Sequence, residues 1–157
     1  TVKACRRARL APGTGGQIVM LAVHEGDHVK AGQLLLELWN DDLAAEVKLA
    51  ENREAASRAK AKEICLRAEE AERNVERLRR IRRQRLVSET DFDKAITNAK
   101  AGQASCKAAR VESQVNAARV AFARARLERT ILRAPFAGTV AEVNGELGEF
   151  ITPSPTG

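Results

Sequence analysis

Six arginines within nine positions are the side chains of this sequence that are best suited to bind a partner. They stand at positions 77, 79, 80, 82, 83 and 85. Arginine suits the end of a helix, where the backbone dipole is negative, but this accounts for only a few of them. Six like charges so close together repel one another. We therefore predict a docking surface that meets hydrogen-bond acceptors on a partner.

Other reactive side chains form no catalytic or metal-binding pattern of useful specificity. His24 and His28 share a loop with Glu25 and Asp27 and could make a weak metal site, but a solvated β-turn is the better interpretation. Ser88 has no histidine near it in the sequence, so we expect it to cap a helix. The sequence therefore predicts a protein that is not an enzyme, with no cofactor and no metal site.

Two proline-free segments place the arginines at the tip of a helical hairpin. The first helix is expected from residue 41 or 42 to about 86, with Asn40 or Asp42 as its N-cap. The second is expected from about 89 to 128, and Ser88 with Asp91 resembles a capping box at its start. Two helices of near-equal length joined by a short turn must lie antiparallel.

Each helix carries apolar residues at three- and four-residue spacing, which predicts a packing seam. The predicted seam of the first helix consists of Leu43, Val47, Ala50, Ala61, Ile64, Ala68, Ala71, Val75 and Leu78. Glu54 and Ser57 interrupt it. The predicted seam of the second consists of Ala104, Ala108, Val111, Val115, Ala118, Phe122 and Ala125. Neither helix can bury its stripe alone, so each packs on the other or on a neighbouring chain.

Cys65 and Cys106 are the only candidates for a disulfide. With a turn near residue 87, Cys106 lies within about one helical turn of the position that faces Cys65. A bridge needs Cα atoms within about 7 Å, whereas packed helix axes lie about 8–10 Å apart. The register of the two helices therefore decides whether the bond can form. We favour free thiols at both positions, and we expect Cys5 to be free unless it links two chains.

The segments on either side of the hairpin resemble two halves of one β-domain. At one constant offset, Gly16 aligns with Gly138, Gly26 with Gly148 and Val29 with Ile151. Strands are expected over 17–23, 34–39, 130–133, 138–143 and 149–151, with positive φ angles at Gly26 and Gly32. A repeat split by an insertion means that the chain leaves a domain and returns to complete it.

The predicted fold class is therefore α+β, a long antiparallel coiled-coil hairpin inserted into a split lipoyl-like β-sandwich. The expected domains are 1–40 for the first β half, 41–129 for the hairpin with its tip near 86–90, and 130–157 for the second half. We expect the chain to be a fragment of a longer protein, because it begins in a strand-like lead-in.

The net charge of +6 and the pI of about 9.6 require nucleic acid to be considered as a partner. The positive charge is mostly arginine on a helical stretch that also carries many glutamates, which is typical of a solvated helix face. Aromatic residues make up only 3% of the chain, so stacking platforms for bases are lacking. We expect no nucleic-acid partner. The longest apolar runs fall far short of the roughly 20 residues that span a bilayer.

The split domain with its inserted hairpin resembles the lipoyl and hairpin module of periplasmic adaptor proteins, the membrane fusion proteins of the HlyD type. That family carries an Arg-x3-Leu-x6-Ser signature at the hairpin tip, and here Arg77, Ile81 and Ser88 match it, with isoleucine in place of leucine. The run after the serine and the stretch from 127 to 140, LERTILRAPFAGTV, are also similar to the family.

The resemblance implies an adaptor that links an inner-membrane transporter of the RND or ABC type to a TolC-like outer-membrane tunnel. It implies docking through Arg77, Ile81 and Ser88, self-association into a ring with a hexamer expected, and a periplasmic location with an inner-membrane anchor outside this chain.

Two alternative functions remain open. A lipoate or biotin carrier needs a lysine at the junction of the two β halves, but residues 39–42 contain none and Lys30 lies in a different loop. A plain coiled-coil spacer would tolerate any sequence at the hairpin tip.

Overall fold

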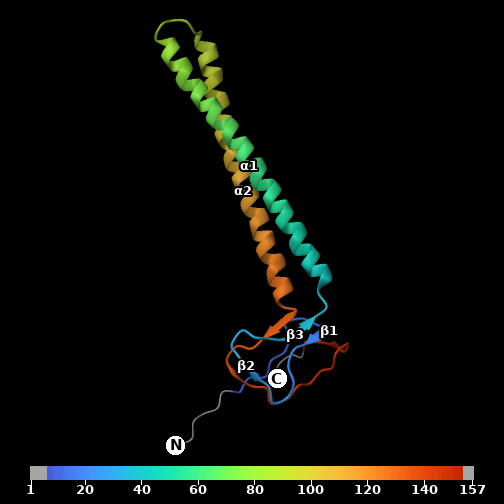
Figure 1. Ribbon diagram of the computed structural model, residues 1–157. Helices are drawn as coiled ribbons and strands as arrows, with labels where there is room; N and C mark the ends of the chain where they lie inside the picture. Colours follow the sequence, from blue (N-terminus) through green and yellow to red (C-terminus); the bar gives the residue numbers. More distant parts are fainter. Residues whose placement is uncertain (1–6, 154–157) are drawn as a thin grey trace, which may run out of the picture. The chain divides into compact units, whose positions relative to one another are not determined.

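The computed structural model describes residues 7–153 and consists of six short strands and two long helices in that range (Figure 1). In chain order they are β1 (Gly16–Leu21), β2 (His28–Val29), β3 (Leu34–Leu38), α1 (Asp41–Arg82), α2 (Glu89–Glu128), β4 (Ile131–Arg133), β5 (Gly138–Thr139) and β6 (Phe150–Ile151). The predicted α+β fold, a helical hairpin inserted between two groups of strands, is confirmed. Neither described helix has the length and apolarity that crossing a membrane requires.

The strands form two antiparallel sheets that mix the two halves of the chain. One sheet has the order β4-β3-β1-β6 and the other pairs β2 with β5. In the first sheet Glu37 of β3 lies opposite Ile131 of β4, so the strand that precedes the hairpin pairs with the strand that follows it. The short strand β2 was not expected from the sequence, because the two turns around it dominate the local pattern.

The predicted internal repeat is confirmed by matching hydrogen bonds. The amide of Gly26 donates to the carbonyl of Val140 at 2.8 Å, and at the equivalent place the amide of Gly148 donates to the carbonyl of Ile18 at 2.8 Å. Both glycines have the positive φ that the turn requires, 90° at Gly26 and 87° at Gly148. Each half therefore uses the same turn to hold a strand of the other half.

The β part contains two small buried clusters, and each of them takes residues from both halves. Val23, Val29 and Leu35 pack with Ala134. The other cluster is formed by Ile18, Leu36 and Leu38, against which Leu132 and Ile151 pack. Neither half can close these clusters alone.

Close contacts divide the chain into two units. One comprises the described residues up to Glu46 and from Ala123 onward, and the other is Val47–Phe122. The first turn of α1 and the last turns of α2 thus group with the strands. The division into 1–40, 41–129 and 130–157 stays a prediction.

The predicted seam of α1 faces α2. Ala61, Ala68 and Val75 are buried, and the other predicted positions are partly buried. The predicted interruption is present as well, because Glu54 is half-buried and its carboxylate pairs with Arg58. α1 therefore packs as its periodicity indicates.

The predicted seam of α2 is wrong. All seven of its positions are exposed, including Val111, Val115 and Phe122 with 50%, 42% and 65% of their surface accessible. The residues that face α1 lie two positions earlier along the helix, and among them are Phe92, Ala95, Ala99, Gly102, Cys106, Asn116 and Ala123. Two residues correspond to about 200° around a helix, so the predicted stripe lies on the opposite face.

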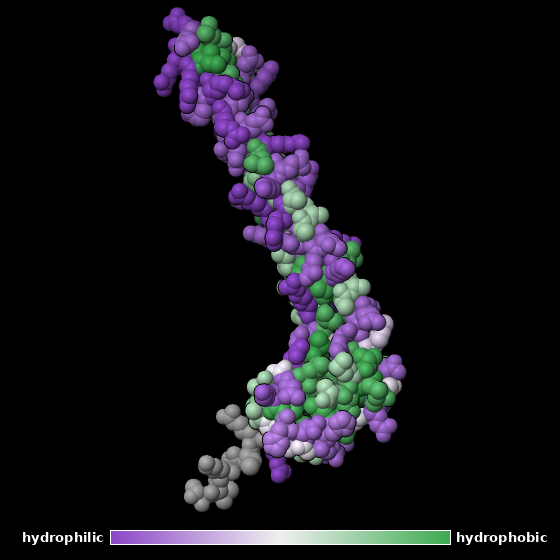
Figure 2. All heavy atoms as spheres, viewed as in Figure 1, coloured by the Kyte–Doolittle hydropathy of each residue, from purple (hydrophilic) through white to green (hydrophobic). Residues whose placement is uncertain are grey.

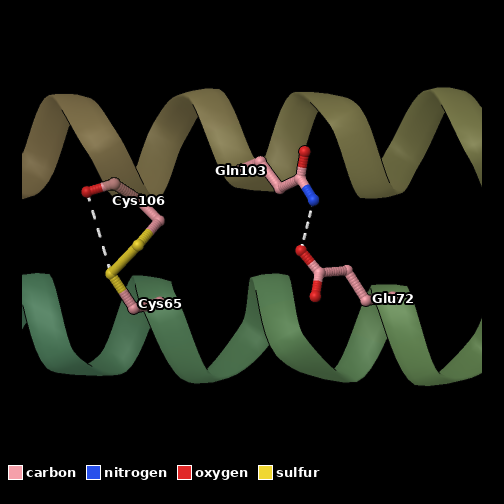
Figure 3. The surroundings of a disulfide bond; sticks show 4 residues. All are labelled: Cys65, Glu72, Gln103 and Cys106. Carbon is pink, nitrogen blue, oxygen red and sulfur yellow. Dashed lines mark hydrogen bonds between the residues drawn. A yellow bond between two sulfur atoms is a disulfide. The ribbon is translucent and has the colours of Figure 1, made fainter.

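The expectation of free thiols is also wrong, because Cys65 and Cys106 form a disulfide between the two helices (Figure 3). Their Cα atoms lie 4.6 Å apart. Small residues permit this approach, since a Cβ placed on Gly102 would lie 3.2 Å from the Cα of Ala68. The usual interhelical spacing does not apply where glycine meets alanine. Cys5 lies outside the described residues.

The hairpin seam becomes polar on one side of the disulfide. The Ser57 hydroxyl donates to the carbonyl of Glu54 at 2.9 Å, and the buried Asn116 accepts a hydrogen bond from Arg119 at 3.1 Å. On the other side, Gln103 donates to Glu72 across the helix pair (Figure 3). The covalent bridge thus lies beside a stretch of the seam that contains the polar residues Ser57 and Asn116.

Removing the second β half should unfold the first. A chain that ends at Arg129 lacks β4, β5 and β6, which supply partners to β3, β2 and β1. We expect the β signal in circular dichroism to disappear while the helical signal remains. A cooperative β melt from such a chain would contradict the split-domain interpretation.

Replacing both Cys65 and Cys106 with serine should lower the free energy of unfolding by about 2–4 kcal/mol, because the bridge closes a long loop in the unfolded chain. Urea unfolding with and without reductant measures this, and the double variant, unlike the native chain, should not respond to reductant. Denatured protein without reductant should show a single free thiol per chain; three would contradict the bridge.

Candidate functional site at the hairpin tip

The hairpin turns at Arg85, the only described non-glycine residue with a positive φ, at 59°. The turn is closed by hydrogen bonds from the amide of Gln84 to the carbonyl of Ile81 and from the amide of Arg85 to the carbonyl of Arg82, both 2.9 Å. Glycine is the usual residue at such a helix end, since the left-handed conformation costs other residues about 1–2 kcal/mol. Arginine therefore stands here at an energetic disadvantage.

Ser88 caps α2, as the sequence predicts. Its hydroxyl oxygen accepts a hydrogen bond from the Asp91 amide at 3.1 Å, and its hydroxyl donates to the Asp91 carboxylate at 2.7 Å. The carbonyl of Ser88 accepts the first helical bond, from the amide of Phe92 at 3.1 Å. A serine cap of this kind is typically worth about 1 kcal/mol.

Arg82 ties the two sides of the turn together. Its guanidinium donates to both carboxylate oxygens of Glu89, at 2.7 and 2.8 Å, and lies over the ring of Phe92 at 4.7 Å. The Arg82 side chain remains 42% exposed, so the ion pair contributes about 0.2–1 kcal/mol. The sequence did not indicate this pair, because only the turn geometry brings the two residues together.

A compact apolar cluster supports the tip. Val75, Phe92, Ala95 and Ala99 are buried together, and the half-buried Leu78, Val87 and Ile96 pack against them. Phe92 is the largest of the buried side chains. The tip is therefore a packed structure rather than a loose connection.

The three predicted docking residues occupy different environments. Arg77 is exposed, and its guanidinium donates to Asn74 at 2.7 Å. Ile81 is half-buried one turn further along, and both residues line a groove of about 1060 Å³ between α1 and α2. Ser88 lies in the turn and is occupied with the cap. The structure brings Arg77 and Ile81 to one groove, which does not include Ser88.

The histidine loop is engaged in the turn that the repeat requires. The amide of His24 donates to Asp27 at 2.7 Å, and Glu25 accepts a hydrogen bond from the amide of Val143 at 3.1 Å. His28 lies 3.4 Å from the hydroxyl of Thr139. Between residues 7 and 153, no group of three or more histidine, cysteine, aspartate or glutamate residues is arranged to hold a metal ion.

The junction of the two β halves is the start of α1. Asn40 immediately precedes the helix, and its carbonyl accepts a hydrogen bond from the amide of Ala44 at 2.9 Å. Its side-chain amide donates to Glu37 and to Thr130, both at 3.0 Å, instead of capping the helix. Asn40 thus links the beginning of the hairpin to its end, at the place where a carrier domain would present a lysine.

A family model for CzcB-like barrel-sandwich hybrid domains matches residues 6–156. The chain belongs to this family. The match covers both β halves and the hairpin between them, so the family membership applies to the whole of the described structure.

Solved structures of adaptor proteins have the same fold as this CzcB-like domain. MacA from Actinobacillus actinomycetemcomitans aligns with a TM-score of 0.78 and 22% identity, over 90% of this chain and 44% of that one. The membrane fusion protein Spr0693 from Streptococcus pneumoniae R6 aligns with a TM-score of 0.59 and 22% identity, over 90% and 50% of the two chains. The periplasmic adaptor protein EmrA aligns with a TM-score of 0.55 and 16% identity, over 96% and 70%.

The predicted resemblance to membrane fusion proteins is therefore confirmed. The CzcB-like chain spans less than half of the MacA chain that it matches. No curated protein matches its sequence. At identities of 16–22% these structural neighbours establish the fold.

Proposed function

We propose that this chain is the lipoyl-like and hairpin part of a non-catalytic periplasmic adaptor. In this proposal the adaptor links an inner-membrane transporter, of the RND or ABC type, to a TolC-like outer-membrane tunnel for efflux or secretion. The observation that carries the proposal is a packed hairpin tip with exposed arginines, on a chain that belongs to a family of adaptor domains.

The tip would dock on the tunnel through Arg77, Ile81 and Ser88. Arg77 retains donor capacity beyond its single bond to Asn74. Ile81 offers an apolar surface at the groove, and Ser88 keeps the start of α2 in the conformation that the partner would meet. In this proposal Arg77 and Ile81 make contacts, while Ser88 acts mainly by fixing the turn.

The interhelical disulfide supports a location outside the reducing cytosol. Structural disulfides persist in oxidising compartments such as the periplasm and are rare in the cytosol. Cys65 and Cys106 lie on helices whose small residues bring them within bridging distance, so the bond fits the fold. We propose a periplasmic location, with an inner-membrane anchor elsewhere in the full-length protein.

Self-association is supported by an exposed apolar stripe on α2 and by two exposed leucines on α1. Val111, Val115 and Phe122 are exposed on α2, on the face turned away from α1. On α1, Leu49 and Leu66 are 50% and 51% exposed. We propose that the α2 stripe of one copy packs on α1 of the next, where Leu49 and Leu66 are exposed, as side-by-side hairpins in a ring with a hexamer expected.

Changing Arg77 to aspartate in the full-length protein should abolish export and leave the melting temperature unchanged, because the side chain is exposed. Ser88→Arg should abolish export too, whereas Ser88→Ala should lose about 1 kcal/mol of stability and keep most of the activity. Export is measured in cells that depend on the adaptor. Native export by Arg77→Asp would contradict docking through this site.

Changing Val111 and Val115 together to glutamate should shift the protein toward monomer in analytical ultracentrifugation. Both side chains are exposed, so the helical signal should remain. The matched control is Asn98→Glu with Ser105→Glu, two exposed positions of α2 outside the stripe. Equal assembly by the stripe variant and the control would exclude the stripe as the interface.

A further inference from the structure

The six tip arginines fall into two groups. Three have partners within the chain: Arg77 with Asn74, Arg79 with Glu76 and Arg82 with Glu89. The side chains of the other three, Arg80, Arg83 and Arg85, are exposed and make no hydrogen bond, ion pair or ring contact with any described residue. The fold therefore uses half of the tip charge and leaves the other half available.

Two side chains at the turn are not engaged in holding the hairpin together. Arg85 has a left-handed conformation that glycine would adopt at lower cost, and its side chain makes no hydrogen bond, ion pair or ring contact that would offset this cost. Leu86, the next residue, is 71% exposed, whereas its neighbour Val87 packs into the cluster beneath the tip. In Figure 2 hydrophobic residues are visible at the end of the hairpin, among hydrophilic ones.

We propose that Arg83, Arg85 and Leu86, here called the apex, form the primary recognition surface of the hairpin, with Arg80 beside them on the last turn of α1. The apex would bind a protein surface in which carboxylates surround an apolar recess. This inference rests on the proposed function and assigns that surface to the periplasmic end of the tunnel.

The chemistry of the apex favours carboxylates on a protein over phosphates on a membrane. A guanidinium group binds a carboxylate through two parallel hydrogen bonds, and such pairs gain strength when an interface excludes water. A membrane site would need more apolar surface, because even a single myristoyl chain binds membranes only reversibly. One exposed leucine offers far less, and Val87 is not available because it packs inside the hairpin.

The apex and the Arg77–Ile81–Ser88 set would then contribute differently to docking. Arg77 and Ser88 are bonded to Asn74 and Asp91 of their own hairpin, so they offer a partner only part of their hydrogen-bonding capacity. The arginines of the apex have no internal partner and offer all of theirs. Arginine is also among the residues that most often dominate the energy of protein interfaces.

Arg85→Gly separates recognition from folding. It removes the strain and the side chain together, so we expect the melting temperature of the full-length protein to rise by a few degrees while export falls. Replacing a residue that has a purely structural role would change the melting temperature and the export activity in the same direction. Leu86→Ser should lower export at an unchanged melting temperature. The matched controls are Arg110→Glu on α2 and Leu147→Ser, whose side chain is 69% exposed; both positions lie outside the tip, and both variants should export normally.

Photo-crosslinking in cells identifies the partner. A photoreactive amino acid is placed at position 83 or 86, and in parallel at 77 or 81, in the full-length protein. Crosslinks from 83 and 86 to carboxylate-bearing periplasmic turns of the tunnel support the inference. Crosslinks to the tunnel from 77 and 81 alone would overturn the inference while leaving the proposed function intact. If none of the four positions gave a crosslink to the tunnel, both the inference and the proposed function would be contradicted. Binding to phosphatidylglycerol vesicles that Arg83→Glu with Arg85→Glu abolishes, without a tunnel crosslink, would assign the apex to membranes and overturn the inference.

Discussion

The whole structure depends on the pairing of β3 with β4 across the inserted hairpin. Glu37 lies opposite Ile131, and the amide of Leu38 donates to the carbonyl of Thr130 at 2.9 Å. The side-chain bond from Asn40 to Thr130 adds a second link, 90 residues apart in the sequence. Because adjacent strands lie about 4.8 Å apart, this pairing requires α1 to begin close to where α2 ends. An antiparallel hairpin follows from that closure.

Small residues and a covalent bond hold the hairpin where large apolar side chains are missing. Ala68 and Gly102 bring the helices close, and the Cys65–Cys106 bridge fixes their register beside a polar stretch that includes Asn116. A two-helix arm has little interior, and a bridge of this kind typically adds about 2–4 kcal/mol of stability. The apolar residues that this packing leaves outside, such as Phe122, remain exposed.

The features of the fold that could be predicted are those that leave a periodic or repeated pattern in the sequence. The spacing of Gly26 and Gly148 indicated two equivalent turns, and the structure shows them with equivalent hydrogen bonds. The ends of α2 followed from Ser88 and from the strand after it. The facing side of α2 could not be predicted, because its strict heptad of alanine, valine and phenylalanine is a stronger pattern than the true inner face, which contains Gly102, Cys106 and Asn116.

At the hairpin tip, too, only part of the structure could be predicted from the sequence. Ser88 as a cap was readable because its partner stands three residues away, whereas the bond from Arg82 to Glu89 and the conformation of Arg85 depend on how the turn closes. A family signature drew attention to Arg77, Ile81 and Ser88. The structure shows in addition which neighbouring arginines have no internal partner, and no pattern of residue types can reveal that.

The most direct test of the account replaces residues 39–129 with a two-residue Asn-Gly turn, which joins Leu38 to Thr130 and so keeps the register of β3 with β4. If the β part is a closed domain into which the helices are inserted, this short chain should give dispersed nuclear magnetic resonance spectra and a single cooperative thermal unfolding transition. A disordered spectrum without a transition would show that the helices are needed to form the β part, and would contradict the account.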